Sequence, residues 1–113
     1  MFKSESKNGL LILKVELKRA TFKDSDQFKS YFEEELKNKY LGVIIDLSKC
    51  EFIDSAFLGI ILYASKLISN SGAQLKLVAC HVDTEALLDL TGISKLLRVY
   101  ESLSEAETSF KIS

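Results

Sequence analysis

The sequence has no proline, one histidine and only two cysteines among its 113 residues. Cys50 and Cys80 form no closely spaced metal motif, and two cysteines in a chain of this size do not indicate secretion. We interpret them as small, buried or half-buried free thiols. His81 lacks a spaced Cys or His partner, so we expect it to end a strand without a function. We expect no metal and no cofactor.

An excess of charge of one sign is also missing, since 15 Lys and Arg face 16 Asp and Glu for a net charge of −1. This balance does not favour a polyanion, so we expect no direct binding of nucleic acid. The sequence contains no apolar run of about 18 residues and no signal-peptide pattern, which predicts a cytoplasmic protein without a membrane segment. Without repeats, linkers or low-complexity tracts, its length suits one domain over residues 1–113.

The first half of the chain predicts a hairpin followed by a helix. Asn8-Gly9 separates two alternating runs, and both residues tolerate the positive φ of a tight hairpin turn. The first of these strands is polar and rich in lysine, as expected at a sheet edge. We expect a loop over Arg19–Asp26 and, capped by Asp24 or Ser25, a helix over about Gln27–Asn38. The helix would bury one apolar stripe: Phe28, Tyr31, Phe32 and Leu36.

The second half alternates buried strands with amphipathic helices. Leu41–Leu47 is apolar and rich in β-branched residues, as in a strand covered on both faces. The elements expected after it are a helix to about Asn70 ended by Gly72, a strand over Gln74–Cys80, a helix over about Glu85–Leu90 capped by Asp83 or Thr84, a strand over Leu96–Tyr100, and a terminal helix capped by Ser104 that contains Ala106 and Phe110. This order predicts an α/β fold with a mixed, mostly parallel sheet of about five strands and four helices.

The junction between the central strand and its helix is the candidate site. Apolar residues recur from Phe57 onward at one face of a 3.6-residue period, so the helix begins near Ser55. Ser55 then occupies the expected N-cap position. The loop lies beyond the carboxyl end of a strand, where open α/β sheets place their sites. Asp46 is interpreted as the acceptor that fixes this loop.

These residues also resemble a known family. Asp46-Leu47-Ser48, Phe52-Ile53-Asp54-Ser55 and Leu58-Gly59 are similar to the marks of the STAS family, in particular its stand-alone bacterial anti-sigma factor antagonists. Leu90-Thr91-Gly92-Ile93 and Ser102–Ala106 extend the resemblance over nearly the whole chain. Two positions depart from it, because Ala56 stands where the family usually has Ser or Thr, and Phe57 where it usually has Gly.

The resemblance implies a function that the spacing alone does not. In the family, the serine directly after the aspartate is phosphorylated by a partner anti-sigma factor that is also a serine kinase and supplies ATP and Mg²⁺. Ser55 is therefore the expected phosphorylation site. The unphosphorylated protein would bind the kinase and free a sigma factor, and the phosphorylated protein would release the kinase. Asp54, Ala56, Phe57 and Gly59 are the expected partner-binding residues.

Each of these residues has a plainer interpretation. Ser55 could be only a helix cap, and Asp54 either orients the reacting groups of the kinase or is an ordinary polar loop residue. Phe57 is either a core aromatic, as its helical phase indicates, or an exposed contact beside Ser55. Gly59 either lets a partner approach closely or is a helix glycine that costs ~1 kcal/mol.

Two other functions compete with the antagonist. A regulatory module for a small ligand or nucleotide would need an enclosed pocket around Ser55 and Phe57. A structural subunit of a signalling assembly would use Ser55 only as a cap. Enzyme activity is not expected, because no histidine, second carboxylate cluster or oxyanion motif accompanies these residues. The oligomeric state stays open.

Overall fold

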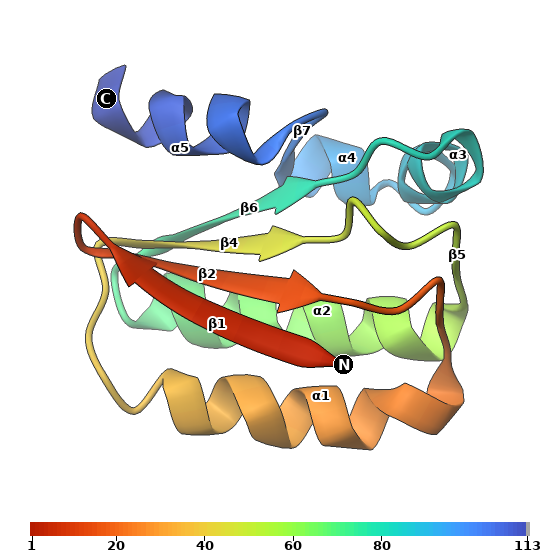
Figure 1. The fold of residues 1–113 in the computed structure, drawn as a ribbon, viewed down its shortest axis with the longest axis horizontal. Coiled ribbons are helices and arrows are strands. Elements are labelled where there is room, and N and C mark those ends of the chain that lie inside the picture. The colour runs from red at the N-terminus through yellow and green to blue at the C-terminus, as the bar shows by residue number, and fades with distance from the viewer. Residues whose placement is uncertain (113) are drawn as a thin grey trace.

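The computed structural model describes residues 1–112 and has a five-stranded sheet with helices on both faces (Figure 1). The strand order is β1-β2-β4-β6-β7, and β3 pairs with β5 separately. The elements are β1 (Phe2–Lys7), β2 (Leu10–Val15), β3 (Arg19–Ala20), α1 (Phe22–Glu35), β4 (Gly42–Asp46), β5 (Phe52–Ile53), α2 (Ser55–Asn70), β6 (Gln74–Val78), α3 (Val82–Leu90), α4 (Ile93–Leu96), β7 (Arg98–Tyr100) and α5 (Leu103–Ile112).

The sheet is mixed and mostly parallel, as predicted. β1 is antiparallel to β2, and the β2–β4, β4–β6 and β6–β7 pairs are all parallel. The hairpin turn has Asn8 at φ 53° and Gly9 at φ 81°, the left-handed conformation expected of Asn-Gly. β1 is an edge strand. The described residues form five helices instead of four, because the short helix α4 lies between the predicted third helix and the predicted last strand and takes Leu96 from that strand.

The first helix begins earlier than predicted because Thr21 is its cap. Thr21 Oγ1 accepts the Lys23 N–H at 3.3 Å, and the Thr21 N–H donates to Asp24 Oδ2 at 3.1 Å. These reciprocal bonds form a capping box. The prediction of a loop over Arg19–Asp26, with Asp24 or Ser25 as the cap, is therefore wrong. Sequence alone did not reveal the two-residue strand β3 in this segment.

Two later caps are also displaced. α3 follows His81 without a side-chain cap, so neither Asp83 nor Thr84 caps it. Thr84 lies inside the helix and its buried hydroxyl donates to the Cys50 carbonyl at 2.9 Å. At α5 the Ser102 hydroxyl accepts the Glu105 N–H at 3.1 Å, which places the capping role two residues before the predicted Ser104.

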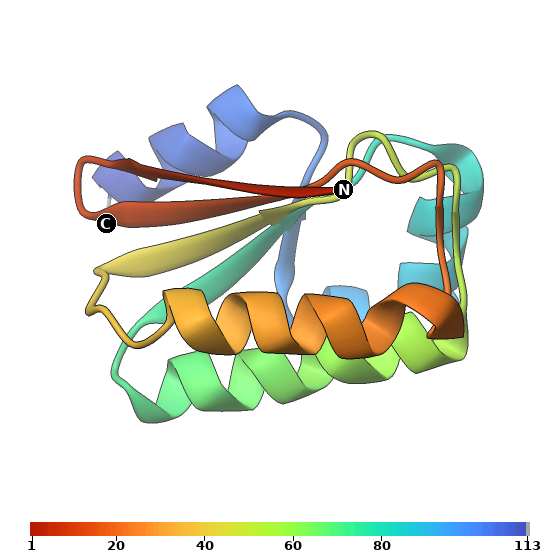
Figure 2. The same ribbon diagram turned by 60° about the horizontal axis from the view of Figure 1, so that its bottom comes forward.

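The core lies on both faces of the sheet. α1 and α2 run side by side over one face, and α5 covers part of the other (Figures 1 and 2). Phe28, Phe32 and Phe57 are among the largest fully buried side chains under α1 and α2. On the opposite face, Phe110 of α5 packs directly on Gly42 of β4, where an added Cβ would be 2.4 Å from the ring.

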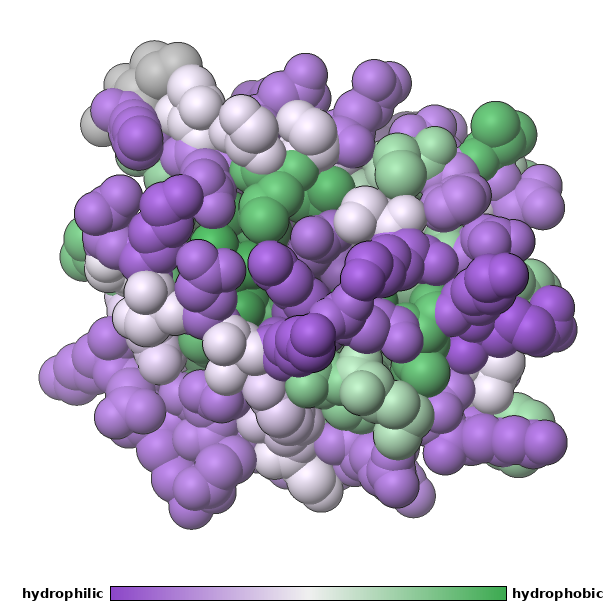
Figure 3. All heavy atoms as spheres, viewed as in Figure 1, coloured by the Kyte–Doolittle hydropathy of each residue, from purple (hydrophilic) through white to green (hydrophobic). Residues whose placement is uncertain are grey.

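The surface is largely polar on the face that Figure 3 shows, with apolar side chains in small separate areas. No helix among residues 1–112 is both long and apolar enough to cross a bilayer.

Candidate functional site

The Ser55 loop lies at the edge of the sheet where the parallel strands end. β4 ends at Asp46, and the chain that follows forms the two-residue strand β5, which pairs with β3. α2 then begins at Ser55 (Figure 1). Asp46 is buried, and its Oδ1 accepts the Ser48 N–H at 2.9 Å. Asp46 therefore has the loop-fixing role that was predicted for it.

Asp54, not Ser55, caps α2. Its Oδ1 accepts the Phe57 N–H at 2.9 Å, and its backbone is extended at φ −96° and ψ 175°. Its Oδ2 accepts the Phe22 N–H at 2.8 Å, and its own N–H donates to the Ala20 carbonyl at 3.1 Å. One carboxylate thus holds the first turns of both α1 and α2. Sequence reasoning placed the cap one residue too late because Asp and Ser are equally good caps.

Ser55 is consequently the first residue of α2 and carries a free hydroxyl. Its side chain is exposed, and within residues 1–112 the hydroxyl makes no hydrogen bond. The first N–H groups of a helix and the positive end of its dipole favour an anion at this position. Ala56 and Gly59 are exposed on the same turn region, and a Cβ added at Gly59 would meet no atom within 4 Å.

Phe57 belongs to the core. Its side chain has 0% exposure and its ring stacks on Phe28 with centroids 4.9 Å apart and planes 17° from parallel. The alternative in which Phe57 is an exposed contact is therefore wrong, and the helical phase had indicated the correct one. The stack anchors the first turn of α2 and so fixes where Ser55 lies.

Several exposed residues near this loop escaped the sequence analysis. Phe22, at the start of α1, is 66% exposed, and Phe52 of β5 is 38% exposed. The Arg19 guanidinium lies 4.3 Å from the centre of the Phe52 ring. Lys18 and Lys23 are exposed on the same stretch. In the sequence, the only sign of this exposed group was that Phe22 and Phe52 fall in segments that we interpreted as loops. The positions of both side chains depend on the pairing of β3 with β5.

The two cysteines differ sharply. Cys50 is fully buried, and burial together with the nearby Asp46 carboxylate raises the pKa of its thiol to about 12. Cys80 is exposed, so the expectation of burial holds for Cys50 only, and both thiols are free. His81 precedes α3 as its N-cap residue. No group of three His, Cys, Asp or Glu side chains in the described part of the chain could hold a metal ion.

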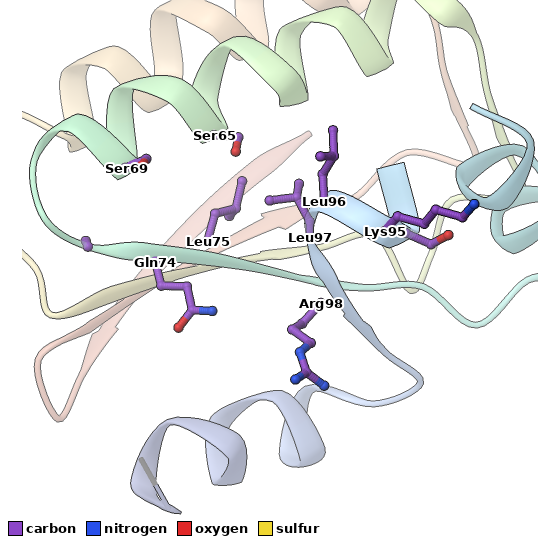
Figure 4. A pocket seen from close by; sticks show the side chains of 10 residues that line it. Ser65, Ser69, Gln74, Leu75, Lys95, Leu96, Leu97 and Arg98 are labelled. Atoms are coloured by element: carbon purple, nitrogen blue, oxygen red, sulfur yellow. The ribbon is translucent and has the colours of Figure 1, made fainter. Parts of the chain in front are cut away.

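A hollow of about 570 Å³ lies away from Ser55, between the second half of α2 and the segment from α4 to β7 (Figure 4). Leu96 and Leu97 point toward α2, whereas Gln74 and Arg98 point away from it. Neither Ser55 nor Phe57 lines this hollow. Phe57 is fully buried in the core, so its side chain is not available to line the enclosed pocket that a ligand-binding module would need around those two residues.

Comparison with known proteins decides the family. The family model of the STAS domain matches residues 2–106. The chain belongs to the STAS domain family. A Thermotoga maritima STAS relative named “Putative anti-sigma factor antagonist” is 34% identical over 90 residues, which are 79% of this chain and 80% of the relative. The anti-sigma F factor antagonist of Paenibacillus polymyxa is 27% identical over 96% of this chain and 92% of its own.

Solved structures agree with the fold of this STAS domain. The crystal structure of a putative anti-sigma factor antagonist from Thermotoga maritima superposes with a TM-score of 0.86 at 29% identity. The match covers 96% of this chain and 92% of the Thermotoga chain. The unphosphorylated anti-sigma factor antagonist SpoIIAA covers 100% of this chain and 98% of its own with a TM-score of 0.83. At 11% identity, SpoIIAA shows a likeness of fold only.

Proposed function

We propose that this STAS protein is a cytoplasmic anti-sigma factor antagonist that is switched by phosphorylation of Ser55. The observation that carries the proposal is the position of Ser55, an exposed hydroxyl at the first residue of α2 with no internal hydrogen bond among the described residues. The unmodified protein binds an anti-sigma factor kinase, which then frees its sigma factor. The phosphorylated protein lets the kinase go. The relatives that bear the name anti-sigma factor antagonist support this role.

The reaction itself belongs to the partner. The kinase binds ATP and Mg²⁺, and the γ-phosphoryl group passes from ATP to Ser55 Oγ. The bond from Pγ to the bridging oxygen of ADP breaks, a bond from Pγ to Oγ forms, the hydroxyl proton passes to a base of the kinase, and ADP leaves. Both carboxylate oxygens of Asp54 already accept backbone N–H groups, so this residue positions Ser55 in the reaction.

The added charge is large enough to cause release. A phosphoserine carries about −1.5 to −2 at neutral pH. Leaving one charge poorly paired in an interface costs roughly 2–5 kcal/mol. At 1.4 kcal/mol per factor of ten, the affinity falls about 30-fold to several-thousand-fold. No change of fold is needed for a switch of that size.

The test uses three variants as baits in the source cell: Ser55→Ala, Ser55→Asp and, as a matched control for added charge, Ser30→Asp on the exposed side of α1. We expect Ser55→Ala and Ser30→Asp to capture an anti-sigma factor kinase and Ser55→Asp to lose it. The purified kinase with ATP should add one phosphoryl group to the wild type at Ser55, as read by mass spectrometry. An unmodified Ser55, with Ser55→Asp still bound, would refute the proposal and favour a structural subunit.

A further inference from the structure

β7 is an edge strand of the sheet, and one side of its backbone has no neighbouring strand. Among the described strands, β7 pairs only with β6. The Tyr100 carbonyl accepts the Ala79 N–H at 2.9 Å, so the backbone of Tyr100 faces β6. Neighbouring residues of a strand direct their N–H and C=O groups to opposite sides, so those of Val99 face away from β6. This side of β7 can therefore accept a further strand.

The hollow of about 570 Å³ adjoins this edge (Figure 4). The pairing of β6 with β7 begins only at Lys76 and Arg98, so Gln74 and Leu75 of β6 line the hollow without a strand beside them. Leu96, which is 74% exposed, lines the same hollow and points toward α2. The edge of the sheet thus steps inward next to β7, and a chain that pairs along β7 would continue into the hollow.

Opposite charges lie at the two ends of β7. Two cations line the hollow at its beginning, and three carboxylates line a smaller hollow of about 210 Å³ at its end: Lys95 and Arg98, then Glu85, Asp89 and Glu101. None of these five side chains forms an ion pair within residues 1–112. Asp83 and Glu105 of the neighbouring helices line neither hollow. The edge therefore presents unpaired charge of both signs, separated along one strand.

The opposite edge of the sheet differs in this respect. β1 is the other edge strand, and all three of its charged side chains have partners in the same chain: Lys3 pairs with Glu16, Lys7 with Glu107, and Glu5 with Lys14. Charged side chains on an edge strand protect it from pairing with another chain. At β7 the charges have no partners in the chain, and the surface that complements them is the same edge turned about a two-fold axis.

We propose that two copies of this chain associate through their β7 edges, antiparallel and around a two-fold axis at Val99. The two Val99 residues then exchange both of their backbone hydrogen bonds. Arg98 lies opposite Tyr100 of the partner subunit, whose ring attracts a guanidinium. Glu101 of the partner subunit lies opposite Leu97, in the hollow that Lys95 also lines. The axis repeats each contact, and because β7 has only three residues, the dimer is weak and reversible.

This inference does not rest on the proposed function, since Ser55 lines neither hollow. Sedimentation of the wild type over a range of concentrations should show a reversible equilibrium of monomer and dimer that salt weakens. A protein that stays monomeric up to about 1 mM would overturn the proposal.

The backbone contact is tested at Val99. Val99→Pro removes the N–H that faces away from β6, a change that an edge strand tolerates. The two-fold axis doubles the loss, so we expect this variant to weaken the dimer about 30-fold while circular dichroism shows an unchanged monomer fold. Val99→Thr keeps the N–H and should associate like the wild type. A dimer that survives Val99→Pro would overturn pairing through this edge.

The charge contacts are tested by exchanging the two signs. One variant carries Lys95→Glu with Arg98→Glu, and the other carries Asp89→Lys with Glu101→Lys. Each alone places like charges across the two-fold axis and should weaken its own dimer about 30-fold or more. Mixed in equal amounts, the two variants restore opposite charges at both ends and should form a heterodimer as tight as the wild-type dimer. Self-association of either variant at wild-type strength, or failure of the mixture to associate, would overturn the proposal.

Discussion

At the scale of single residues, Asp54 determines the geometry of the site. Its two carboxylate oxygens and its own N–H link the first turn of α2, the first turn of α1 and the end of β3. Ser55, the residue after it, has no such duty in the described structure. Because Asp54 caps α2 and accepts the Phe22 N–H, the Ser55 hydroxyl is not needed for either contact and remains free to be modified.

Substitution of Asp54 should destabilise the protein in proportion to the acceptors that it loses. We expect Asp54→Ala to lower the free energy of unfolding by about 1–2 kcal/mol, because loss of a cap typically costs ~1 kcal/mol and the Phe22 N–H loses its acceptor as well. Asp54→Asn keeps one acceptor oxygen and should cost about half as much. Urea denaturation measures both. Equal stability of the wild type and Asp54→Ala would show that the cap contributes nothing.

The two thiols should react at very different rates. Burial keeps the pKa of Cys50 at about 12, so almost no thiolate forms at neutral pH, while Cys80 is exposed. A thiol reagent such as DTNB should label one cysteine rapidly in the native protein and the second only on unfolding. Cys80→Ser should abolish the rapid phase. A rapid phase that survives this substitution would contradict the buried position of Cys50.

At the scale of elements, α5 is attached to the sheet through a close contact between one glycine and one ring. Gly42 of β4 leaves the space that Phe110 fills, and a Cβ there would be 2.4 Å from the ring. We expect Gly42→Ala to cost about 1–3 kcal/mol of stability through overpacking. In a Phe110→Ala background the cost should largely disappear, which a double-mutant cycle measures.

The matched control is Gly59→Ala, because an added Cβ at this helical position meets no atom within 4 Å. This substitution should stabilise the protein by up to ~1 kcal/mol through helix propensity. A cost for Gly42→Ala that is the same with and without Phe110 would place its origin in the β4 backbone and not in the contact with α5.

A carboxylate joins β1, the end of β2 and the loop after β4. Glu16 pairs with Lys49 and Lys3, which lower its pKa from an ordinary 4.5 to about 2. A pKa lowered by folding stabilises the native state above the unfolded value, and this contribution disappears as the pH falls from 4.5 towards 2. We therefore expect the urea midpoint of Glu16→Gln to fall less steeply than that of the wild type over this range. Parallel curves would contradict the ion pair.

At the scale of the whole molecule, the sequence predicted the sheet better than the boundaries near the site. Apolar periodicity located β4, α2 and β6 to within a few residues, because their burial is decided locally. The caps were misplaced where several good capping residues lie within one turn of each other, as at Thr21 and Asp24 or Asp54 and Ser55. Tertiary partners choose among them, and such partners cannot be read from one segment.

The candidate site was predicted in part for the same reason. The resemblance of the motif located Ser55 and its neighbours, and helical phase alone indicated that Phe57 is buried. The contact between Arg19 and the exposed Phe52 ring was missed because it exists only when β3 and β5 pair across a long separation in sequence. A strand of two residues has no periodicity of its own to recognise.

Phosphorylation should leave the fold of the whole molecule unchanged. Phosphorylation of Ser55 breaks no internal hydrogen bond of the described structure, because the Ser55 hydroxyl makes none there. The stack of Phe57 on Phe28 also anchors the helix that carries Ser55. We expect the amide ¹H–¹⁵N shifts of the phosphoserine protein to differ from those of the unmodified protein only in residues 18–23 and 51–59. Changes that reach the β1–β2 hairpin or α5 would instead indicate a global conformational switch.

The stack of Phe57 on Phe28 has a further consequence for the kinetics of recognition. Phe57, which stands where the family usually has glycine, is buried and anchors the turn that carries Ser55 to the core. This turn is therefore ordered before a partner binds. A partner then spends no binding energy on freezing a mobile loop. Association should need only a correct approach of two rigid bodies, and the lifetime of the complex, not the speed of its formation, becomes what the modification controls.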